Sequence, residues 1–326
     1  MSYSDRNVLI TGGLGFIGST LARRLVDLGA RVTLVDSLIP EYGGNRANIA
    51  GIEDRVTVNI SDVRDEHSLP SLIRGQDLVF NLAGQTSHVD SLHDPYTDLE
   101  INCRAQLSIL ETVRRENPEA KVVFASTRQL YGRPKYLPVD EQHPLAPVDP
   151  NGVNKAAGES YHLVYGEIYG LRCSVLRLTN TYGPRMRVKD DRQTFLGTWL
   201  RLAVEGEELL VFGDGTQQRD FTYVDDGVEA FLLAGDSPAA DGEVFNVGGE
   251  PPVSLADLAG LLVELAGAGS WRLVPFPDER RTIDIGDYFA DDTKIRSRLG
   301  WEPRVGLREG LERSLAYYRD HGADYW

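Results

Sequence analysis

Residues 7–18 read Asn7-Val-Leu-Ile-Thr-Gly-Gly-Leu-Gly-Phe-Ile-Gly18, an apolar run that passes directly into a glycine-rich turn. The apolar run predicts a buried strand, and the spacing of apolar residues over 21–28 predicts a helix after the turn. Gly12, Gly15 and Gly18 recur every third residue, which permits a tight turn and a close approach of the backbone to a pyrophosphate. The free N–H groups at the start of the helix then favour a bound dinucleotide.

Further apolar runs continue the pattern along the first half of the chain. They cover residues 31–35, 56–60, 78–82, 121–125 and 173–178, and helical stretches over roughly 97–115 and 152–169 separate some of them. Strands that are apolar throughout are buried on both faces, which happens when helices cover both sides of a parallel sheet. The sequence therefore predicts an α/β fold with a Rossmann-type doubly wound parallel sheet.

The composition changes after about residue 180, where glycine, proline and charged residues become denser and the expected elements become shorter. We expect a dinucleotide-binding domain over residues 1–180 and a smaller C-terminal α/β lobe over residues 181–326. The segment around 220–250 can return to the first domain, so this boundary is not sharp.

Acidic residues follow the second and third predicted strands. Asp36 lies about 20 residues after the glycine turn, where a carboxylate accepts hydrogen bonds from a ribose diol and repels a 2′-phosphate. This position favours NAD over NADP. Asp62 is a second candidate, because it can accept a hydrogen bond from the adenine amine, although an ordinary surface aspartate fits the sequence equally well.

The overall composition excludes several classes of function. The chain has 326 residues with 49 acidic and 34 basic side chains, and its formal charge of −15 argues against a nucleic-acid partner. No apolar run reaches the ~18 residues of a spanning helix, so no membrane partner is expected. Only Cys103 and Cys173 occur and no leader pattern begins the chain, which favours a cytoplasmic protein. We expect no metal site.

Several short motifs follow the glycine turn in a fixed order. They are Asn81-Leu-Ala-Gly84, Ser87-His-Val-Asp-Ser91, Ser126-Thr127 with Tyr131-Gly132, Arg177 with Asn180 and Tyr182-Gly-Pro184, Arg219-Asp-Phe-Thr-Tyr-Val-Asp225, and Leu299-Gly-Trp-Glu-Pro303. Together they resemble the extended short-chain dehydrogenase/reductases, and specifically the NAD-dependent nucleotide-sugar epimerases and dehydratases. The resemblance runs nearly end to end, and agreement among independent motifs makes it specific.

The resemblance implies a tightly held NAD that takes a hydride from a sugar carbon and later returns it. It implies a nucleoside-diphosphate sugar as substrate, and a homodimer that pairs two helices of each subunit. The catalytic groups of the family are a Ser or Thr, a Tyr that acts as base, and a Lys four residues after the Tyr. Thr127 matches the first of these and Lys155 the last.

The resemblance also assigns binding residues by position. For the cofactor it implies Gly12, Gly15, Phe16, Ile17, Gly18, Asp36, Asp62, Val63, Leu82, Ala83 and Lys155. For the substrate we expect contacts from Ser87, Thr127, Arg128, Asn180, Arg219 and Arg281. Arginine suits a diphosphate because its planar fork binds phosphate through two parallel hydrogen bonds.

The catalytic tyrosine of the family is missing from this chain. The residue four before Lys155 is Asn151, and an amide cannot accept a proton near neutral pH. Asn151 can therefore only orient a substrate oxygen or a water. A literal Tyr-x-x-x-Lys does occur at residues 131–135, but Gly132 and Pro134 argue against the helix that would place both side chains on one face.

Another group must then act as base. His88 follows the fourth predicted strand, where the site is expected, and histidine titrates in the right range. His143, Lys155, Tyr131 and Tyr182 are the alternatives. A histidine that only supports the loop also fits the sequence at position 88.

The two residues after Thr127 are a second departure from the family. Its 4,6-dehydratases have an Asp-Glu pair there to eliminate water, whereas this chain has Arg128 and Gln129, which cannot shuttle a proton. Elimination is therefore disfavoured. Arg128 offers a fixed cation for a sugar carboxylate or a phosphate, and a loop cation paired with a neighbouring carboxylate fits equally well.

These observations predict an NAD-dependent epimerase of a nucleoside-diphosphate sugar, which acts through a transient ketone and a base other than tyrosine. A nucleotide-sugar dehydratase or decarboxylase is the second hypothesis. The third is a catalytically silent NAD-binding member that has kept the fold and lost the base.

Overall fold

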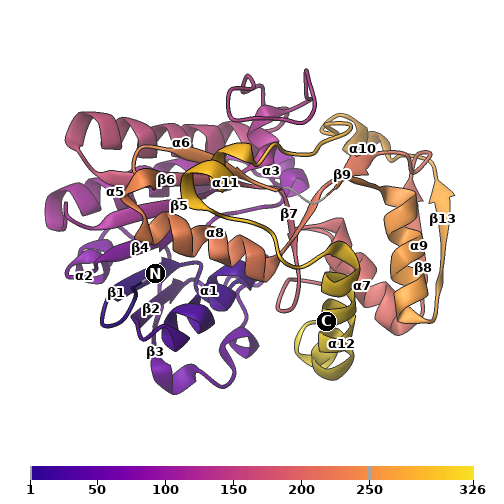
Figure 1. The fold of residues 1–326 in the computed structure, drawn as a ribbon, viewed down its shortest axis with the longest axis horizontal. Coiled ribbons are helices and arrows are strands. Elements are labelled where there is room, and N and C mark those ends of the chain that lie inside the picture. Colours follow the sequence, from indigo (N-terminus) through magenta and orange to yellow (C-terminus); the bar gives the residue numbers. More distant parts are fainter. Residues whose placement is uncertain (1, 249–250) are drawn as a thin grey trace.

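A central sheet of seven parallel strands organises the chain, whose computed structural model describes residues 2–248 and 251–326 (Figure 1). The strand order is β11-β6-β5-β4-β1-β2-β3. The strands are β1 (Asn7–Thr11), β2 (Arg31–Asp36), β3 (Val56–Ile60), β4 (Leu78–Asn81), β5 (Lys121–Thr127), β6 (Arg172–Leu178) and β11 (Val244–Val247). The order reverses between β1 and β4, and doubly wound folds bind ligands at the carboxyl ends of such neighbours. The predicted fold class is confirmed.

Helices cover both faces of the sheet (Figure 1). On one face lie α2 (Leu69–Ile73), α5 (Ala105–Glu116) and α6 (Pro150–Tyr169), and on the other lie α1 (Phe16–Asp27) and α8 (Val224–Asp236). Every residue of β4 is buried as a result. This explains why the strands in the middle of the sheet are apolar throughout rather than alternating.

The helices predicted over 97–115 and 152–169 are both present. The first begins as α4 (Pro95–Leu99), passes through a π-helical turn (Glu100–Arg104) and continues as α5. The second is α6, which Asp149 caps by accepting a hydrogen bond from the Gly152 amide at 2.7 Å. A proline at the first helical position costs nothing, because that N–H has no partner within a helix.

The rest of the chain forms the elements beyond the carboxyl ends of the sheet and along its edge (Figure 1). The helices are α3 (His88–His93), α7 (Phe195–Glu205), α9 (Leu255–Ala266), α10 (Asp278–Arg281), α11 (Thr293–Leu299) and α12 (Leu307–His321). The short strand pairs are β7 (Asn180–Tyr182) with β10 (Phe221–Tyr223), β8 (Glu208–Phe212) with β13 (Ser270–Val274), and β9 (Gln218–Arg219) with β12 (Val253–Ser254). Within the described ranges, no helix has the length and apolar character needed to cross a bilayer.

Candidate active site

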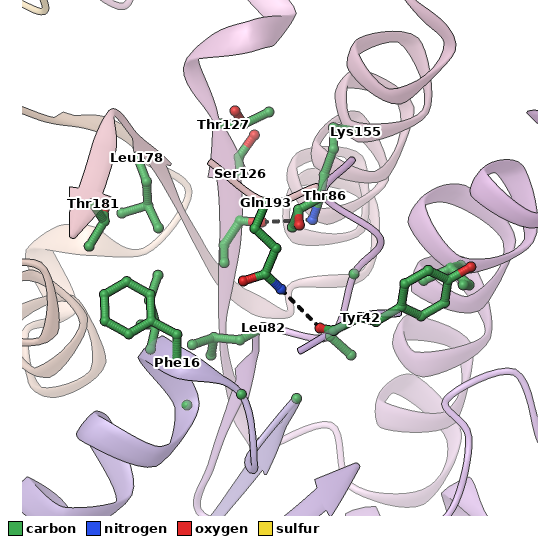
Figure 2. A pocket seen from close by; sticks show the side chains of 18 of the residues that line it. Phe16, Tyr42, Leu82, Thr86, Ser126, Thr127, Lys155, Leu178, Thr181 and Gln193 are labelled. Atoms are coloured by element: carbon green, nitrogen blue, oxygen red, sulfur yellow. Dashed lines mark hydrogen bonds between the residues drawn. The ribbon is translucent and has the colours of Figure 1, made fainter. Parts of the chain in front are cut away.

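One deep pocket opens at the carboxyl ends of the central strands (Figure 2). All the residues predicted to bind the cofactor line it, namely Gly12, Gly15, Phe16, Ile17, Gly18, Asp36, Asp62, Val63, Leu82, Ala83 and Lys155. It is also lined by His88, Thr127, Arg128, Asn151 and Asn180. The glycine turn and the proposed catalytic residues therefore share a single cavity.

The glycine turn brings the backbone unusually close to its neighbours. Gly12 has φ +68°, and a Cβ there would lie 3.1 Å from the backbone of Leu82 and Ala83. At Gly18 a Cβ would lie 2.2 Å from the Gly12 carbonyl oxygen. Gly15 caps α1 without a side chain, so the first N–H groups of the helix are free to bind an anion.

Two carboxylates, those of Asp36 and Asp62, line the same pocket as the glycine turn. Asp36 accepts hydrogen bonds from the Leu14 amide at 3.0 Å and the Leu38 amide at 2.9 Å, which fix its orientation. Burial raises the pKa of Asp36, and these two bonds act in the opposite direction. Asp62 instead pairs with Arg64 at 2.6 Å, and the hydrogen bond from Arg64 lowers the pKa of Asp62.

The part of the pocket that is formed by the glycine turn, the start of α1 and Asp36 fits NAD. The free N–H groups of α1 suit the pyrophosphate, and the fixed Asp36 carboxylate suits a ribose diol. Phe16, Leu82 and Leu178 form an apolar wall for a flat ring (Figure 2). A side chain at position 12 or 18 would not fit into this turn, which accounts for the glycines there.

Lys155 reaches into the pocket from α6, beside Thr86 (Figure 2). Its Nζ donates a hydrogen bond to the Ala125 carbonyl oxygen at 3.2 Å. Burial lowers the pKa of Lys155 to about 8, and the negative charge of Asp98 acts in the opposite direction. His162 lies two turns further along α6, and burial lowers its pKa to about 4, so this histidine is neutral.

Thr127 ends β5 at the wall of the pocket. Its Oγ1 accepts a hydrogen bond from the Gln129 amide at 3.2 Å, and its proton has no acceptor among the described residues. The neighbouring Ser126 hydroxyl donates to Glu159 at 2.7 Å, and Glu159 forms a buried ion pair with Arg177. The Thr127 hydroxyl is therefore available to a ligand, whereas the Ser126 hydroxyl is already engaged.

Asn151 is held by a buried polar network. Its Nδ2 donates to the Gln85 carbonyl oxygen at 2.8 Å and to Asp98 Oδ2 at 2.9 Å. Asp98 is fully buried, and its second oxygen accepts from Asn154 Nδ2 at 2.7 Å. No pattern in the sequence marked the members of this network, which come from the loop after β4, from α4 and from α6. The network engages the amide at the position that the sequence analysis assigns to the catalytic tyrosine of the family.

His88 lies at the first position of α3 and contacts Asp149, the cap of α6. The His88 Nδ1 atom is 3.1 Å from Asp149 Oδ2 but off the direct line of a hydrogen bond. The Asp149 side chain is fully buried and also accepts from the Gln129 side chain at 2.9 Å. Burial acts to raise the pKa of Asp149. The contact with His88 and the hydrogen bonds from Gly152 and Gln129 outweigh burial and lower this pKa, so the carboxylate is ionised. Nε2 of His88 has no hydrogen-bond partner within residues 2–248 and 251–326.

Of the other candidate bases, Lys155 lines the pocket, whereas Tyr131, His143 and Tyr182 do not. Tyr131 is buried, accepts a hydrogen bond from Arg177 at 2.6 Å and donates one to Asn246 at 2.7 Å. The helical turn that contains it ends there, so the prediction that residues 131–135 do not form a helix is confirmed. His143 bonds the backbone of Lys135, and Tyr182 is buried with its hydroxyl on the Leu307 carbonyl oxygen.

The predicted substrate residues are divided between the pocket wall and its surroundings. Arg128 donates to Asn180 Oδ1 at 2.9 Å, and both residues line the pocket. Arg219 is buried behind the wall, where it donates to the Gly286 carbonyl oxygen and the Gln218 carbonyl oxygen. Arg281, on α10, and Ser87, which caps α3, also lie outside the lining. Roles for these three in binding stay predictions.

Some lining residues were not found by sequence reasoning. Gln193 Nε2 donates to the Tyr42 carbonyl oxygen at 3.0 Å and so joins two distant loops beside the cavity (Figure 2). Irregular loops follow no hydrophobic period, so no pattern marked either residue. Thr86 was detectable, because it lies between the β4 motif and Ser87.

Neither cysteine is among the residues that line the pocket. Cys103 and Cys173 are both free, and burial raises the pKa of each thiol, that of Cys173 to about 12. Residues 2–248 and 251–326 contain no group of three or more His, Cys, Asp or Glu side chains that could hold a metal ion. The chemistry of the pocket rests on its hydroxyl, amine, imidazole and guanidinium groups.

Comparison with known proteins identifies relatives along the whole chain. A model of the NAD dependent epimerase/dehydratase family matches residues 8–248. A UDP-glucose 4-epimerase of Mycolicibacterium smegmatis is 32% identical over 96% of this chain and 98% of its own length. A dTDP-glucose 4,6-dehydratase of Streptomyces griseus is 33% identical, with 97% and 94% covered. The crystal structure of UDP-glucose 4-epimerase from Thermotoga maritima with UDP-glucose superposes with a TM-score of 0.88 at 33% identity, covering 96% of this chain and 99% of that one.

Proposed function

The chain belongs to the NAD-dependent epimerase/dehydratase family of nucleotide-sugar-modifying enzymes, and within it we propose an epimerase of a nucleoside-diphosphate sugar that uses His88 as its base. NAD is its cofactor. The observation that carries the proposal is the contact of 3.1 Å between His88 Nδ1 and the buried Asp149 carboxylate, in a pocket where Asn151 replaces the family's tyrosine.

Bound NAD supplies a hydride acceptor that later returns the hydride to the sugar carbon. Thr127 donates a hydrogen bond from its free hydroxyl to the reacting sugar oxygen and so positions it. Lys155 holds the nicotinamide ribose and places a positive charge beside the reacting oxygen. That charge favours loss of the hydroxyl proton.

His88 takes the hydroxyl proton on Nε2 as the ketone forms, and gives it back when the carbon is reduced from the other face. Asp149 supports the positive charge that the ring then carries, because it is ionised and touches Nδ1. A histidine held by a buried carboxylate is a common form of general base.

Lys155 is the rival base. Its lowered pKa gives it a neutral fraction near pH 8, and it already lies in the pocket. Its role in holding the ribose would then have to be combined with proton transfer in the same turnover. His88 has no part in binding the ribose, which favours it over Lys155 as the base.

Dehydration receives little support from the residues present. Gln129 stands where the dehydratases have an acidic residue, and its side-chain amide donates a hydrogen bond to Asp149. Arg128 replaces the other acid and stays protonated at any physiological pH. An epimerase needs only the oxidation and its reversal, which these residues can support.

The reaction in D₂O tests the proposal. The purified protein should contain NAD, and with UDP- or dTDP-sugars it should produce an epimer whose C–H bond carries no solvent deuterium, because the hydride returns from the cofactor. Elimination would place deuterium on the sugar, and decarboxylation would release CO₂. Retained NAD with no conversion across the panel would favour a catalytically silent protein instead.

We also propose that the enzyme is a homodimer formed through the outer faces of α4 and α6. Apolar side chains are exposed there, namely Tyr96, Leu99, Val153, Val164, Ile168 and Tyr169, and Tyr96 is 79% exposed. Exposed apolar patches of this kind mark protein–protein contacts. Sedimentation should give a dimer that Ile168→Glu dissociates, while Leu210→Glu on the distant strand β8 leaves the mass unchanged.

A further inference from the structure

Arg128 has a partly buried guanidinium that lacks a carboxylate partner within residues 2–248 and 251–326. No carboxylate oxygen of the described residues lies within 4 Å of it, and the acids that influence it, Asp220 and Asp284, act only at longer range. Its Nη1 atom is buried and has no hydrogen-bond partner in the part of the chain that the structure describes. A desolvated, unpaired charge is unfavourable, so the position makes physical sense when a bound anion completes it.

The Arg128 guanidinium is also held in place. Nη2 donates to Asn180 Oδ1 at 2.9 Å, and the guanidinium carbon lies 5.3 Å from the centroid of the Tyr288 ring. Asn180 is fixed in turn, because its Nδ2 donates to the Asp220 carbonyl oxygen at 2.9 Å. A cation ordered before the ligand arrives loses little entropy on binding, which favours a specific contact.

The charged residues near Arg128 do not form an ion pair with it, so its guanidinium can bind an anion. Asp220 Oδ2 accepts a hydrogen bond from the Ala290 amide at 3.0 Å, and burial raises the pKa of this carboxyl to about 6. Asp284 lies 3.6 Å from Arg219, with which it pairs. Burial and the positive charge of Arg128 together lower the pKa of Arg219 to about 10. Two guanidinium groups thus lie at one section of the pocket wall, that of Arg128 in the wall and that of Arg219 behind it, and an anion there would relieve their repulsion.

The position of Arg128 indicates which part of a substrate it meets. It directly follows Thr127, which the proposed function assigns to the reacting hydroxyl, and it contacts Asn180, which the family resemblance assigns to the diphosphate. The sugar ring lies between these two groups in any nucleoside-diphosphate sugar. We propose that Arg128 binds a carboxylate on the sugar ring, so that the substrate is a nucleoside-diphosphate sugar acid.

This proposal rests on the proposed function but goes further, since a neutral sugar would satisfy the epimerase. A carboxylate accepts two parallel hydrogen bonds from a guanidinium, whereas a hydroxymethyl group leaves the charge unpaired. The diphosphate is the other possible source of oxyanion oxygens for Arg128. The two sources differ in one respect: only a sugar carboxylate makes affinity depend on the oxidation state of the sugar.

The test compares a neutral sugar and a sugar acid that differ only at C6, with the nucleoside diphosphate alone as the reference. Calorimetry on the NAD-loaded protein would measure binding of UDP, UDP-glucose and UDP-glucuronate, and of the dTDP series if it binds more tightly. We expect the sugar acid to bind at least tenfold more tightly than the neutral sugar. Arg128→Gln should remove that preference and leave the affinity for UDP alone within threefold. Arg133→Gln, an exposed arginine outside the pocket, is the matched control and should keep the preference.

Each other outcome overturns the proposal. Equal affinity of the wild type for both sugars would mean that Arg128 meets no carboxylate. Equal losses for UDP, UDP-glucose and UDP-glucuronate in Arg128→Gln would assign the arginine to the diphosphate. The proposed function would survive both results, because neutral sugars would still bind. Failure of the proposed function is a different result, because it appears as solvent deuterium in the sugar, released CO₂ or no epimer formed, and not as a change in relative affinity.

Discussion

His88 and Asp149 meet at the entrance to α6, with Nδ1 of the imidazole 3.1 Å from Oδ2 of the carboxylate. The contact joins the loop after β4 to the cap of the helix that carries Lys155. Removing the imidazole should remove the proton acceptor and leave the cofactor site intact. We expect His88→Ala to lower kcat at least tenfold and to retain its NAD, measured by turnover and by nucleotide released on denaturation. His67→Ala, an exposed histidine, is the control, and near-normal turnover of His88→Ala would eliminate this base.

Asp149→Asn tests whether the two residues act as a unit. Asparagine caps a helix about as well as aspartate, so α6 should keep its start while the negative charge is lost. We expect kcat to fall three- to tenfold. In the double variant with His88→Ala, the second change should add nothing, because the carboxylate acts only through the imidazole. A multiplicative loss of kcat in the double variant would give Asp149 a separate role.

Lys155 supports a prediction about stability and pH. Its pKa falls from 10.5 in an unfolded chain to about 8 in the fold, so between pH 8 and 10.5 the unfolded chain binds more protons. The lysine therefore costs the fold stability below pH 8, and this cost disappears as the pH rises to 10.5. Lys155→Met should be inactive yet more stable than the wild type at pH 7, by on the order of 3 kcal/mol.

Urea unfolding of the nucleotide-free proteins at pH 7, 8, 9 and 10 checks this. The difference in free energy of unfolding between Lys155→Met and the wild type should shrink steadily across the series. Groups other than Lys155 titrate in both proteins and cancel in that difference. A difference that does not change with pH would mean that burial leaves the lysine unshifted.

Asn151 and Asn154 both donate to Asp98, but only Asn151 lines the pocket. Replacing either by alanine leaves a buried carboxylate oxygen without one donor, which should cost about 1–3 kcal/mol of stability. We expect both variants to lose similar stability in urea and to keep kcat within threefold. If Asn151→Ala alone lost a hundredfold in kcat, the amide would have a direct part in the chemistry.

Most of the fold could be predicted from the sequence. The strands of the doubly wound sheet are apolar because helices cover both faces, and this local composition marks them without knowledge of the neighbours. The spacing of the glycine turn also marks it locally, although the backbone that comes close to Gly12 belongs to the distant residues Leu82 and Ala83. The π-helical turn at 100–104 was not predicted, because the apolar spacing runs across it unchanged.

The site was less predictable, because its important contacts join residues far apart in the chain. The sequence marked Asn151 as anomalous but not its bond to Asp98, which depends on how α4 packs against α6. It marked His88 but not Asp149, for the same reason. Arg219 matched a motif, and only the packing behind the pocket wall reveals that backbone carbonyl groups occupy its guanidinium.

We expect Asp36 to determine which dinucleotide the pocket prefers, and its charge can be removed without changing its size. In Asp36→Asn the amide cannot repel a 2′-phosphate, so the ratio of NAD to NADP affinity should fall at least tenfold. Binding of NAD itself should weaken several-fold, because the asparagine cannot accept from both the Leu14 and Leu38 amides and the ribose. Fluorescence titration of nucleotide-free protein measures both affinities. Asp62→Asn is the matched control, because Asp62 is expected at the adenine amine, away from the 2′ position, and its ratio should not change. An unchanged ratio in Asp36→Asn would mean that the discrimination comes from the shape of the pocket rather than from this carboxylate.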